Sequence, residues 1–131
     1  DFRKAHAISQ TINDTTYDQI KNATGYDHNW CLNTYKDGKG DDTKVCASLY
    51  SPITGILLEM YTNEPGVQVY TGNFQGTGIA CKHGIKYPKH VSVCLESQKY
   101  PDSPNKKDWP SPYLKPGEKY HSHVAYKFSI K

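Results

Sequence analysis

Apolar and polar residues alternate along several short segments of this chain. Alternation with a period of two predicts β-strands, because successive side chains of a strand point to opposite faces. The pattern occurs in residues 45–50, 56–63, 67–71, 91–98 and 120–130. Segment 56–63 carries apolar residues on both faces, which is typical of a strand that is covered on both sides.

The connecting segments are rich in Gly, Pro and polar residues. They predict a turn or hairpin tip at residues 36–43, turns at 51–55 and 64–66, a Gly-rich loop at 75–89 and a Pro-rich irregular stretch at 100–117. The connections are therefore expected to be hairpins, apart from the long Pro-rich excursion. No repeat or linker divides the chain, and the pattern as a whole predicts mainly antiparallel β structure.

One short helix is predicted near the N-terminus. Residues 15–21 are expected to form one or two helical turns, with Thr15 as the N-cap and Asp18 three residues later. Gly25 is expected to end this helix, because glycine adopts the left-handed conformation that commonly follows a helix C-terminus.

The composition agrees with this pattern and excludes some classes of partner. Tyr is common, at 11 of 131 residues, which favours β structure. The formal net charge is +3 and the Lys residues are scattered, so neither nucleic acid nor a membrane is an expected partner. The N-terminus has no apolar signal-peptide core and no initiator Met, so we expect that residues upstream of Asp1 were removed.

The cysteines bear on the cellular compartment. They are too sparse for a disulfide scaffold, and none of them forms a C-x-x-C pair; they are Cys31, Cys46, Cys81 and Cys94. We expect free, buried thiols in a reducing compartment, which predicts a cytoplasmic protein. The glycosylation sequons at Asn13 and Asn22 are weak evidence for secretion, because such tripeptides are frequent by chance.

Glu96 is the first candidate for chemistry, in the predicted strand 91–98. Alternation places it on one face of that strand with Ser92, Cys94 and Gln98. A carboxylate held mid-strand among small neighbours suits a rigid, concave polar site. Periodicity alone nevertheless favours a solvated strand face.

Two further segments combine polar and aromatic side chains, the mixture that holds sugars. Residues 27–30 read Asp-His-Asn-Trp, although an ordinary turn is the favoured interpretation of these four residues alone. In residues 66–73, Gln68 and Tyr70 share one face of a short strand, with Gly72 and Asn73 following. This second segment suggests a site without identifying it.

Metal and nucleotide chemistry have little support. His121 and His123 lie on one face of a strand, but no third ligand has the spacing of a zinc site. A Cys–His nucleophile pair is possible from composition, and nothing specific supports it. The sequence has no phosphate loop, dinucleotide fingerprint or G-x-S-x-G elbow.

Taken together, five segments resemble motifs of the aldose 1-epimerase family, in the same order. Residues 25–30 are similar to its G-[FY]-D-H-N motif, and residues 62–73 to T-x-x-P-G-x-Q-x-Y-T-x-N. Residues 87–105 resemble the strand and loop that carry the family's catalytic Glu. Residues 114–120 are similar to L-x-P-G-E-x-Y, and residues 1–4 resemble the F-D-[FL]-R segment that precedes the Asp motif.

This resemblance implies a fold, an activity and a set of site residues. The implied fold is mainly β, an antiparallel β-sandwich of the galactose mutarotase-like (supersandwich) type, with residues 1–131 as the incomplete, C-terminal part of a single domain. The implied activity is interconversion of the α and β anomers of aldohexoses such as galactose and glucose, without a cofactor or metal. Carried over by position, Glu96 is the general base, Asp27 binds sugar hydroxyls, and Gln68 lines the same pocket.

The implied chemistry suits these residue types. Mutarotation needs a base to remove the proton of the C1 hydroxyl and an acid to protonate the ring oxygen. The ring opens, the C1–C2 bond rotates, and the ring closes on the other face. A positioned acid or base contributes about 10²–10⁴-fold to the rate of such a step.

The chain departs from the family in one respect that matters for activity. Family members are more than twice as long, and their general-acid histidine and a second sugar-contacting histidine lie in an N-terminal portion that nothing here matches. We therefore expect this chain alone to be nearly inactive and to need the N-terminal portion of the same enzyme as its partner. Two alternatives remain: a carbohydrate-binding β-sandwich without catalysis, and a hexose-6-phosphate 1-epimerase, which would need a basic pocket.

Overall fold

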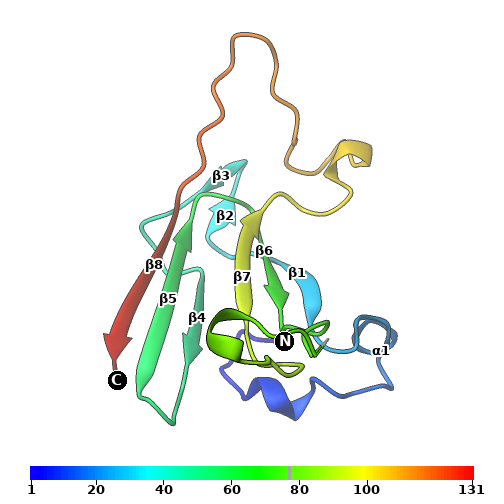
Figure 1. Ribbon diagram of the computed structural model, residues 1–131. Coiled ribbons are helices and arrows are strands. Elements are labelled where there is room, and N and C mark those ends of the chain that lie inside the picture. Colours follow the sequence, from blue (N-terminus) through cyan, green and yellow to red (C-terminus); the bar gives the residue numbers. More distant parts are fainter. Residues whose placement is uncertain (77) are drawn as a thin grey trace. The chain divides into compact units, whose positions relative to one another are not determined.

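A computed structural model describes residues 1–76 and 78–131, and most of its regular elements are short strands (Figure 1). In chain order the elements are η1 (Ile8–Gln10), α1 (Asp18–Ala23), β1 (Asp27–Cys31), β2 (Tyr35–Lys36), β3 (Lys39–Gly40), β4 (Ala47–Tyr50), β5 (Ile56–Thr62), β6 (Gly66–Tyr70), η2 (Lys82–Gly84), β7 (Cys94–Gln98), η3 (Ser103–Asn105) and β8 (Val124–Ile130). None of the described helices is long and apolar enough to cross a membrane.

The strands form three sheets, with the orders β1-β6-β7, β2-β3 and β4-β5-β8. The pairs β2–β3, β4–β5 and β5–β8 are antiparallel, as predicted. The chain also divides into two compact units: unit 1 comprises residues 1–28 and 69–94, and unit 2 comprises residues 29–68 and 95–131. The strands of the β1-β6-β7 sheet supply residues to both units.

Unit 1 contains the helix and the Gly-rich loop. Its buried apolar side chains are Ile12, Ile20 and Tyr26. The predicted helix exists but begins two residues late, because Tyr17 rather than Thr15 is the N-cap residue and makes no side-chain capping bond. Thr24, in the left-handed conformation, ends it one residue before Gly25. Residues 75–89 are loop-like as predicted, apart from the short η2, and residue 77 of that prediction lies outside the described residues.

Unit 2 contains the β4-β5-β8 sheet, whose register places apolar residues opposite one another. Leu58 of β5 lies between Leu49 and Phe128, and Met60 lies between Ala47 and Tyr126. Directly opposed side chains share a face of the sheet. Figure 1 shows β5 running between β4 and the red C-terminal strand β8.

Burial of that shared face differs between the strands. Met60 and Thr62 of β5 are fully buried, whereas Ile56 is 42% exposed. On β8 the exposed fraction rises from 45% at Val124 and 46% at Tyr126 to 66% at Phe128 and 78% at Ile130. The prediction that β5 is covered on both sides therefore describes only the part of the strand around Met60.

Two expectations about local structure were wrong. The turn predicted at residues 64–66 does not close a hairpin: residues 63–65 form a bend that leads from the β4-β5-β8 sheet into β6 of a different sheet. The cysteines are free, but Cys31, Cys81 and Cys94 are exposed rather than buried. Cys46 alone is half-buried, and its burial raises the pKa of the thiol.

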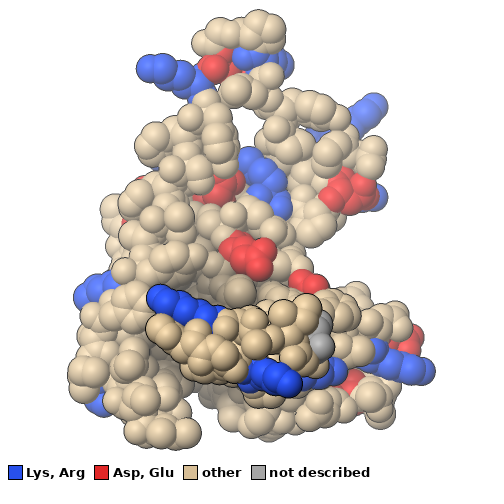
Figure 2. Space-filling model, viewed as in Figure 1, with Lys and Arg blue, Asp and Glu red and all other residues tan. Residues whose placement is uncertain are grey.

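The charged side chains do not concentrate on the visible surface. Figure 2 shows Lys and Arg dispersed among uncharged residues and interleaved with Asp and Glu. This distribution agrees with the small net charge of +3.

Met60 offers a test of the unit 2 core. We expect Met60→Ala to lower the free energy of unfolding by about 2–5 kcal/mol, because it leaves a cavity around a fully buried side chain. Urea unfolding of the purified protein measures this. The control is Ile53→Ala in the turn after β4, where the side chain is 94% exposed and the change should stay within about 0.5 kcal/mol. Equal effects at both positions would contradict this description of the core.

Candidate active site

Glu96 lies at the centre of β7, as the sequence predicts. Strand alternation directs Glu96 and Gln98 to one side of β7, which we call its front, and Leu95 and Ser97 to the other side, its back. Leu95 is 8% exposed, whereas Glu96 is exposed to solvent. The side chain of Glu96 makes no hydrogen bond or ion pair with any residue that the structure describes. Its carboxylate is thus held on a strand and open to a ligand.

The front of β7 is linked to β6, its neighbour, and to β1, the strand beyond β6, through three amide side chains. Nε2 of Gln98 donates to Oε1 of Gln68 at 3.2 Å and to Oδ1 of Asn29 at 3.1 Å. A neutral amide nitrogen has two protons, so these bonds use the whole donor capacity of Gln98. The structure therefore brings Gln68, predicted as a sugar-binding residue, to the side of β7 that carries Glu96.

Gly66 makes room for this amide cluster. A Cβ atom at Gly66 would lie 2.4 Å from Oδ1 of Asn29, far closer than a van der Waals contact. The glycine of the P-G-x-Q motif therefore allows Asn29 to lie across β6 and to meet Gln98. Neither Asn29 nor Gln98 was singled out as a site residue from the sequence, although the alternation of Glu96 with Gln98 already placed Gln98 on the correct face.

Asp27 is the first residue of β1 and belongs to unit 1, where its side chain is exposed. Its backbone N–H donates to Nδ1 of His28 at 3.0 Å. The turn interpretation of residues 27–30 is wrong, because all four belong to a strand. The carboxylate of Asp27 is therefore presented from regular structure, and its role in sugar binding stays a prediction.

A buried polar network fixes the backbone directly before Asp27. Thr71 and Asn73 are 1% and 3% exposed, and both bond the peptide of Tyr26. Oγ1 of Thr71 accepts from the Tyr26 N–H at 3.0 Å, and Nδ2 of Asn73 donates to the Tyr26 carbonyl at 2.9 Å. Gly25 must be glycine here: its φ is +145°, and a Cβ would lie 2.3 Å from Oδ1 of Asn73. Thr71 and Asn73, at the end of the 62–73 motif, thus fix the backbone directly before Asp27 within unit 1.

A buried carboxylate, Glu64, lies in the bend between β5 and β6. Its side chain is 3% exposed; Nζ of Lys99 lies 2.5 Å from Oε2, and the Tyr120 hydroxyl donates to Oε1 at 2.8 Å. Burial by itself would raise the pKa of Glu64 and is the largest single influence. Hydrogen bonds from Lys99, Tyr120 and Ser122, with the charge of Lys99, outweigh it and lower that pKa from 4.5.

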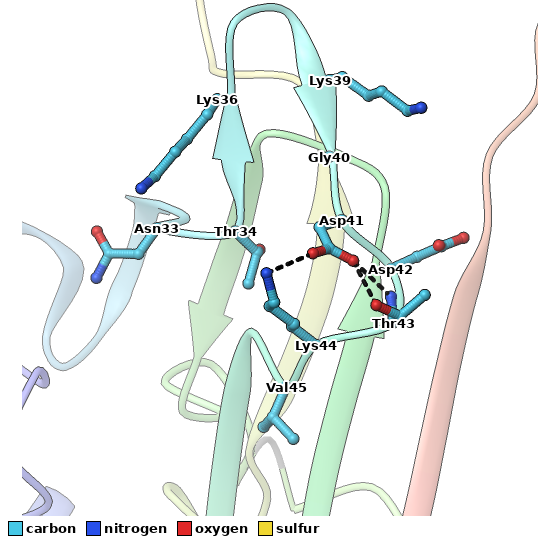
Figure 3. Close-up of a pocket in the computed structure, with 10 residues that line it drawn as sticks. All are labelled: Asn33, Thr34, Lys36, Lys39, Gly40, Asp41, Asp42, Thr43, Lys44 and Val45. Carbon is cyan, nitrogen blue, oxygen red and sulfur yellow. Dashed lines mark hydrogen bonds and ion pairs between the residues drawn. The ribbon is translucent and has the colours of Figure 1, made fainter.

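A hollow beside the β2-β3 hairpin is lined by residues 33–34, 36 and 39–45 (Figure 3). It is not a basic pocket, because Lys44 is paired with Asp41 at 2.8 Å and Asp42 adds a second carboxylate. Hydrogen bonds from Lys44 and Thr43 hold the pKa of Asp41 at about 2. Lys36 and Lys39 extend in different directions (Figure 3). The lining includes neither Gln68 nor Glu96.

Within residues 1–76 and 78–131, no group of three or more His, Cys, Asp or Glu side chains is arranged to hold a metal ion. His123, half of the pair considered as zinc ligands, instead places Nδ1 2.9 Å from Oδ2 of Asp42.

Comparison with known proteins identifies the family. A family model described as aldose 1-epimerase matches residues 1–127. The chain belongs to the aldose 1-epimerase family. It is 44% identical over 106 residues to a galactose mutarotase of Mus musculus, covering 81% of this chain and 30% of that protein. It is 39% identical over 131 residues to the aldose 1-epimerase of Escherichia coli K12, covering 98% of this chain and 36% of that protein.

The fold comparison agrees. The crystal structure of an aldose epimerase homologue from C. elegans matches with a TM-score of 0.64 and 25% sequence identity, over 80% of this chain and 30% of that one. The predicted family and the mainly β, mutarotase-like fold class are confirmed. This aldose 1-epimerase family member spans about a third of the length of the relatives it matches.

Glu64 gives the protein a specific acid sensitivity. Because its pKa is lowered by folding, its contribution to stability is complete above the unfolded value of 4.5 and is lost as the pH falls through the folded value. We expect Glu64→Gln to lower the free energy of unfolding by about 1–3 kcal/mol at pH 7. The difference between wild type and variant should shrink below pH 4.5. Urea unfolding between pH 3 and 7 measures it, with Glu118→Gln, an exposed carboxylate, as the control. A difference that stays constant over this range would refute the assignment.

Proposed function

We propose that this chain carries the general base and part of the sugar site of an aldose 1-epimerase that interconverts the α and β anomers of aldohexoses such as galactose and glucose. The observation that carries the proposal is the position of Glu96: a solvent-open carboxylate on a regular strand, within a chain whose family match extends over residues 1–127. Relatives at 39–44% identity are named galactose mutarotase and aldose 1-epimerase.

In the proposed reaction, the Glu96 carboxylate takes the proton of the sugar's C1 hydroxyl. The electron pair left on that oxygen forms the C1 carbonyl, the bond from C1 to the ring oxygen breaks, and a general acid protonates the ring oxygen. The open-chain aldehyde rotates about C1–C2, and the reverse proton transfers close the ring on the other face. Proton transfer in both directions needs no cofactor, and we assign none.

Gln68 and Asp27 are the proposed sugar-binding residues. Gln68 is supported by its link to Gln98, because the amide cluster holds its side chain on the side of β7 from which Glu96 projects. Asp27 is supported by the anchored backbone before it, since a carboxylate on fixed backbone can accept hydrogen bonds from sugar hydroxyls without first losing conformational freedom.

We further propose that residues 1–131 are the C-terminal part of a single epimerase domain, and that its upstream portion supplies the general acid. The chain spans 30–36% of its relatives. Among the described residues, no histidine side chain bonds Glu96. The exposed apolar end of the β4-β5-β8 sheet, at Ile56, Phe128 and Ile130, also supports an upstream partner, because apolar surface of this kind is commonly covered in a complete domain.

The alternatives lack a specific observation in their favour. A hexose-6-phosphate epimerase would need a basic pocket, and the hollow of Figure 3 contains two carboxylates among its lysines. A carbohydrate-binding module would not need a base at Glu96. As part of the proposal we assign the protein to the cytoplasm, because its four thiols are free.

Glu96 provides the decisive test. We expect the full-length protein to accelerate the mutarotation of fresh α-D-galactose, followed by polarimetry, and Glu96→Gln to lower kcat by about 10²–10⁴-fold, because the amide cannot accept the hydroxyl proton. The matched control is Glu118→Gln, an exposed glutamate directly after the Pro-rich stretch 100–117, with kcat unchanged. Full activity in Glu96→Gln would sink the assignment. Sugar binding without anomer exchange, seen by NMR of the anomeric protons, would favour the binding module.

If the base lies in this chain and the acid lies in the upstream portion, the two pieces should complement each other. The 131-residue chain alone should be nearly inactive, and co-expression with the upstream portion should restore turnover. Phe128→Ser should weaken that complementation, because it removes an apolar side chain from the uncovered face, whereas Ile53→Ser in an exposed turn should not. Robust turnover by the 131-residue chain alone would show that the acid lies within it.

A further inference from the structure

The back of β7 is held by a second set of polar contacts, which the proposed reaction does not use. Ser97 bonds Thr62, Lys99 bonds Glu64, and the Tyr126 hydroxyl donates to the Leu95 carbonyl at 2.6 Å. All of these residues belong to unit 2. Glu96 and Gln98 on the front therefore alternate with anchored residues on the back.

Thr62 is the first anchor, and its hydrogen bonding is saturated. Its hydroxyl donates to the His123 carbonyl at 2.8 Å and accepts from the Glu64 N–H at 3.1 Å. Its only proton is thus used, so the 2.6 Å contact with Oγ of Ser97 must be donated by Ser97. Thr62 is fully buried, which makes each of these bonds expensive to lose.

Glu64 is the second anchor and the only one that is charged. Lys99 bonds one of its carboxylate oxygens and Tyr120 bonds the other. Glu64 thus joins the residue that follows β7 and the segment after the Pro-rich stretch to the bend before β6. Lys99 is 30% exposed and Glu64 is 3% exposed. Removal of one partner leaves the other charge partly or wholly desolvated, whereas removal of both charges does not.

We propose that the Glu64–Lys99 pair is a positioning device for Glu96, which holds β7 in the register at which the carboxylate reaches the C1 hydroxyl. This inference rests on the proposed epimerase function. The coupling is mechanical: Lys99 lies three residues beyond Glu96 and on the opposite side of the strand, roughly 10 Å along the chain. A displacement of about 1 Å at a reacting group can lower a rate by about 10²-fold.

The test uses the full-length protein with Glu64→Gln, Lys99→Gln and the double variant. We expect each single substitution to lower kcat for α-D-galactose roughly tenfold, with KM within about twofold. Backbone amides of residues 95–98 should exchange with solvent faster in the single variants. The double variant should recover most of the kcat, because two neutral amides can bond each other. The apparent pKa of the acid limb of the pH–rate profile should be the same in wild type and variants.

The matched control is a carboxylate–lysine pair that joins β5 and β8, Glu59 and Lys127, whose charged atoms are 3.1 Å apart. Glu59→Gln and Lys127→Gln should leave both kcat and the exchange of β7 unchanged. If Glu64→Gln does not fold, Tyr120→Phe removes one hydrogen bond from a 64% exposed side chain and should give a smaller change in the same direction.

The outcomes separate this proposal from the proposed function. If the Glu64 and Lys99 variants show faster amide exchange in β7 but the wild-type protein has no epimerase activity, the Glu64–Lys99 pair still holds β7 and the epimerase assignment is wrong. If the wild-type protein is active and the Glu64 and Lys99 variants keep its kcat and its rates of amide exchange in β7, only the positioning role of the Glu64–Lys99 pair is overturned. Equal losses in the control pair, no recovery in the double variant, or a moved acid limb would also overturn it.

Discussion

Strand alternation in β7 is the constraint on which the candidate site depends. Because successive side chains point to opposite sides, the strand cannot present Glu96 and Gln98 on its front without presenting Leu95 and Ser97 on its back. The back is anchored by buried partners, and the front is linked to β6 and β1 by amides. A carboxylate that is itself exposed is thereby carried on backbone that is held from both sides.

The long motif at residues 62–73 is largely the source of this anchoring. Thr62 and Glu64 hold the back of β7, and Gly66 leaves space for Asn29. Thr71 and Asn73 hold the peptide before Asp27 in unit 1. Only Gln68 among these residues has a proposed contact with sugar. Most of the motif therefore consists of residues that position other residues.

Glu64 illustrates how a buried charge can serve such a role. A carboxylate this well buried is unfavourable unless charged and neutral donors surround it, and Lys99, Tyr120 and Ser122 provide them. The arrangement joins segments that are distant in sequence at one point, and it does so with strict geometry. An apolar contact would bury the same surface but would specify the position of β7 less narrowly.

The sequence by itself determined strands β4 to β8, most of the turns and the family, whereas β1 was wrongly interpreted as a turn. Period-two alternation and motif order are local properties, and local backbone geometry suffices to express them. It also placed Glu96 and Gln98 on one face of a strand. It did not reveal the exposed thiols, the bend from β5 into a second sheet, or the uncovered end of the β5–β8 face, since burial depends on what packs against a residue.

Only the tertiary structure decided which polar residues meet. The sequence contains Asn29, Gln68 and Gln98 as three unrelated amides, and Glu64 and Lys99 as two charges separated by 34 residues. Whether such groups pair depends on how the sheets bring distant segments together, and no local pattern encodes that pairing. The identity of the candidate base could therefore be predicted from sequence, whereas the contacts that hold it in place could not.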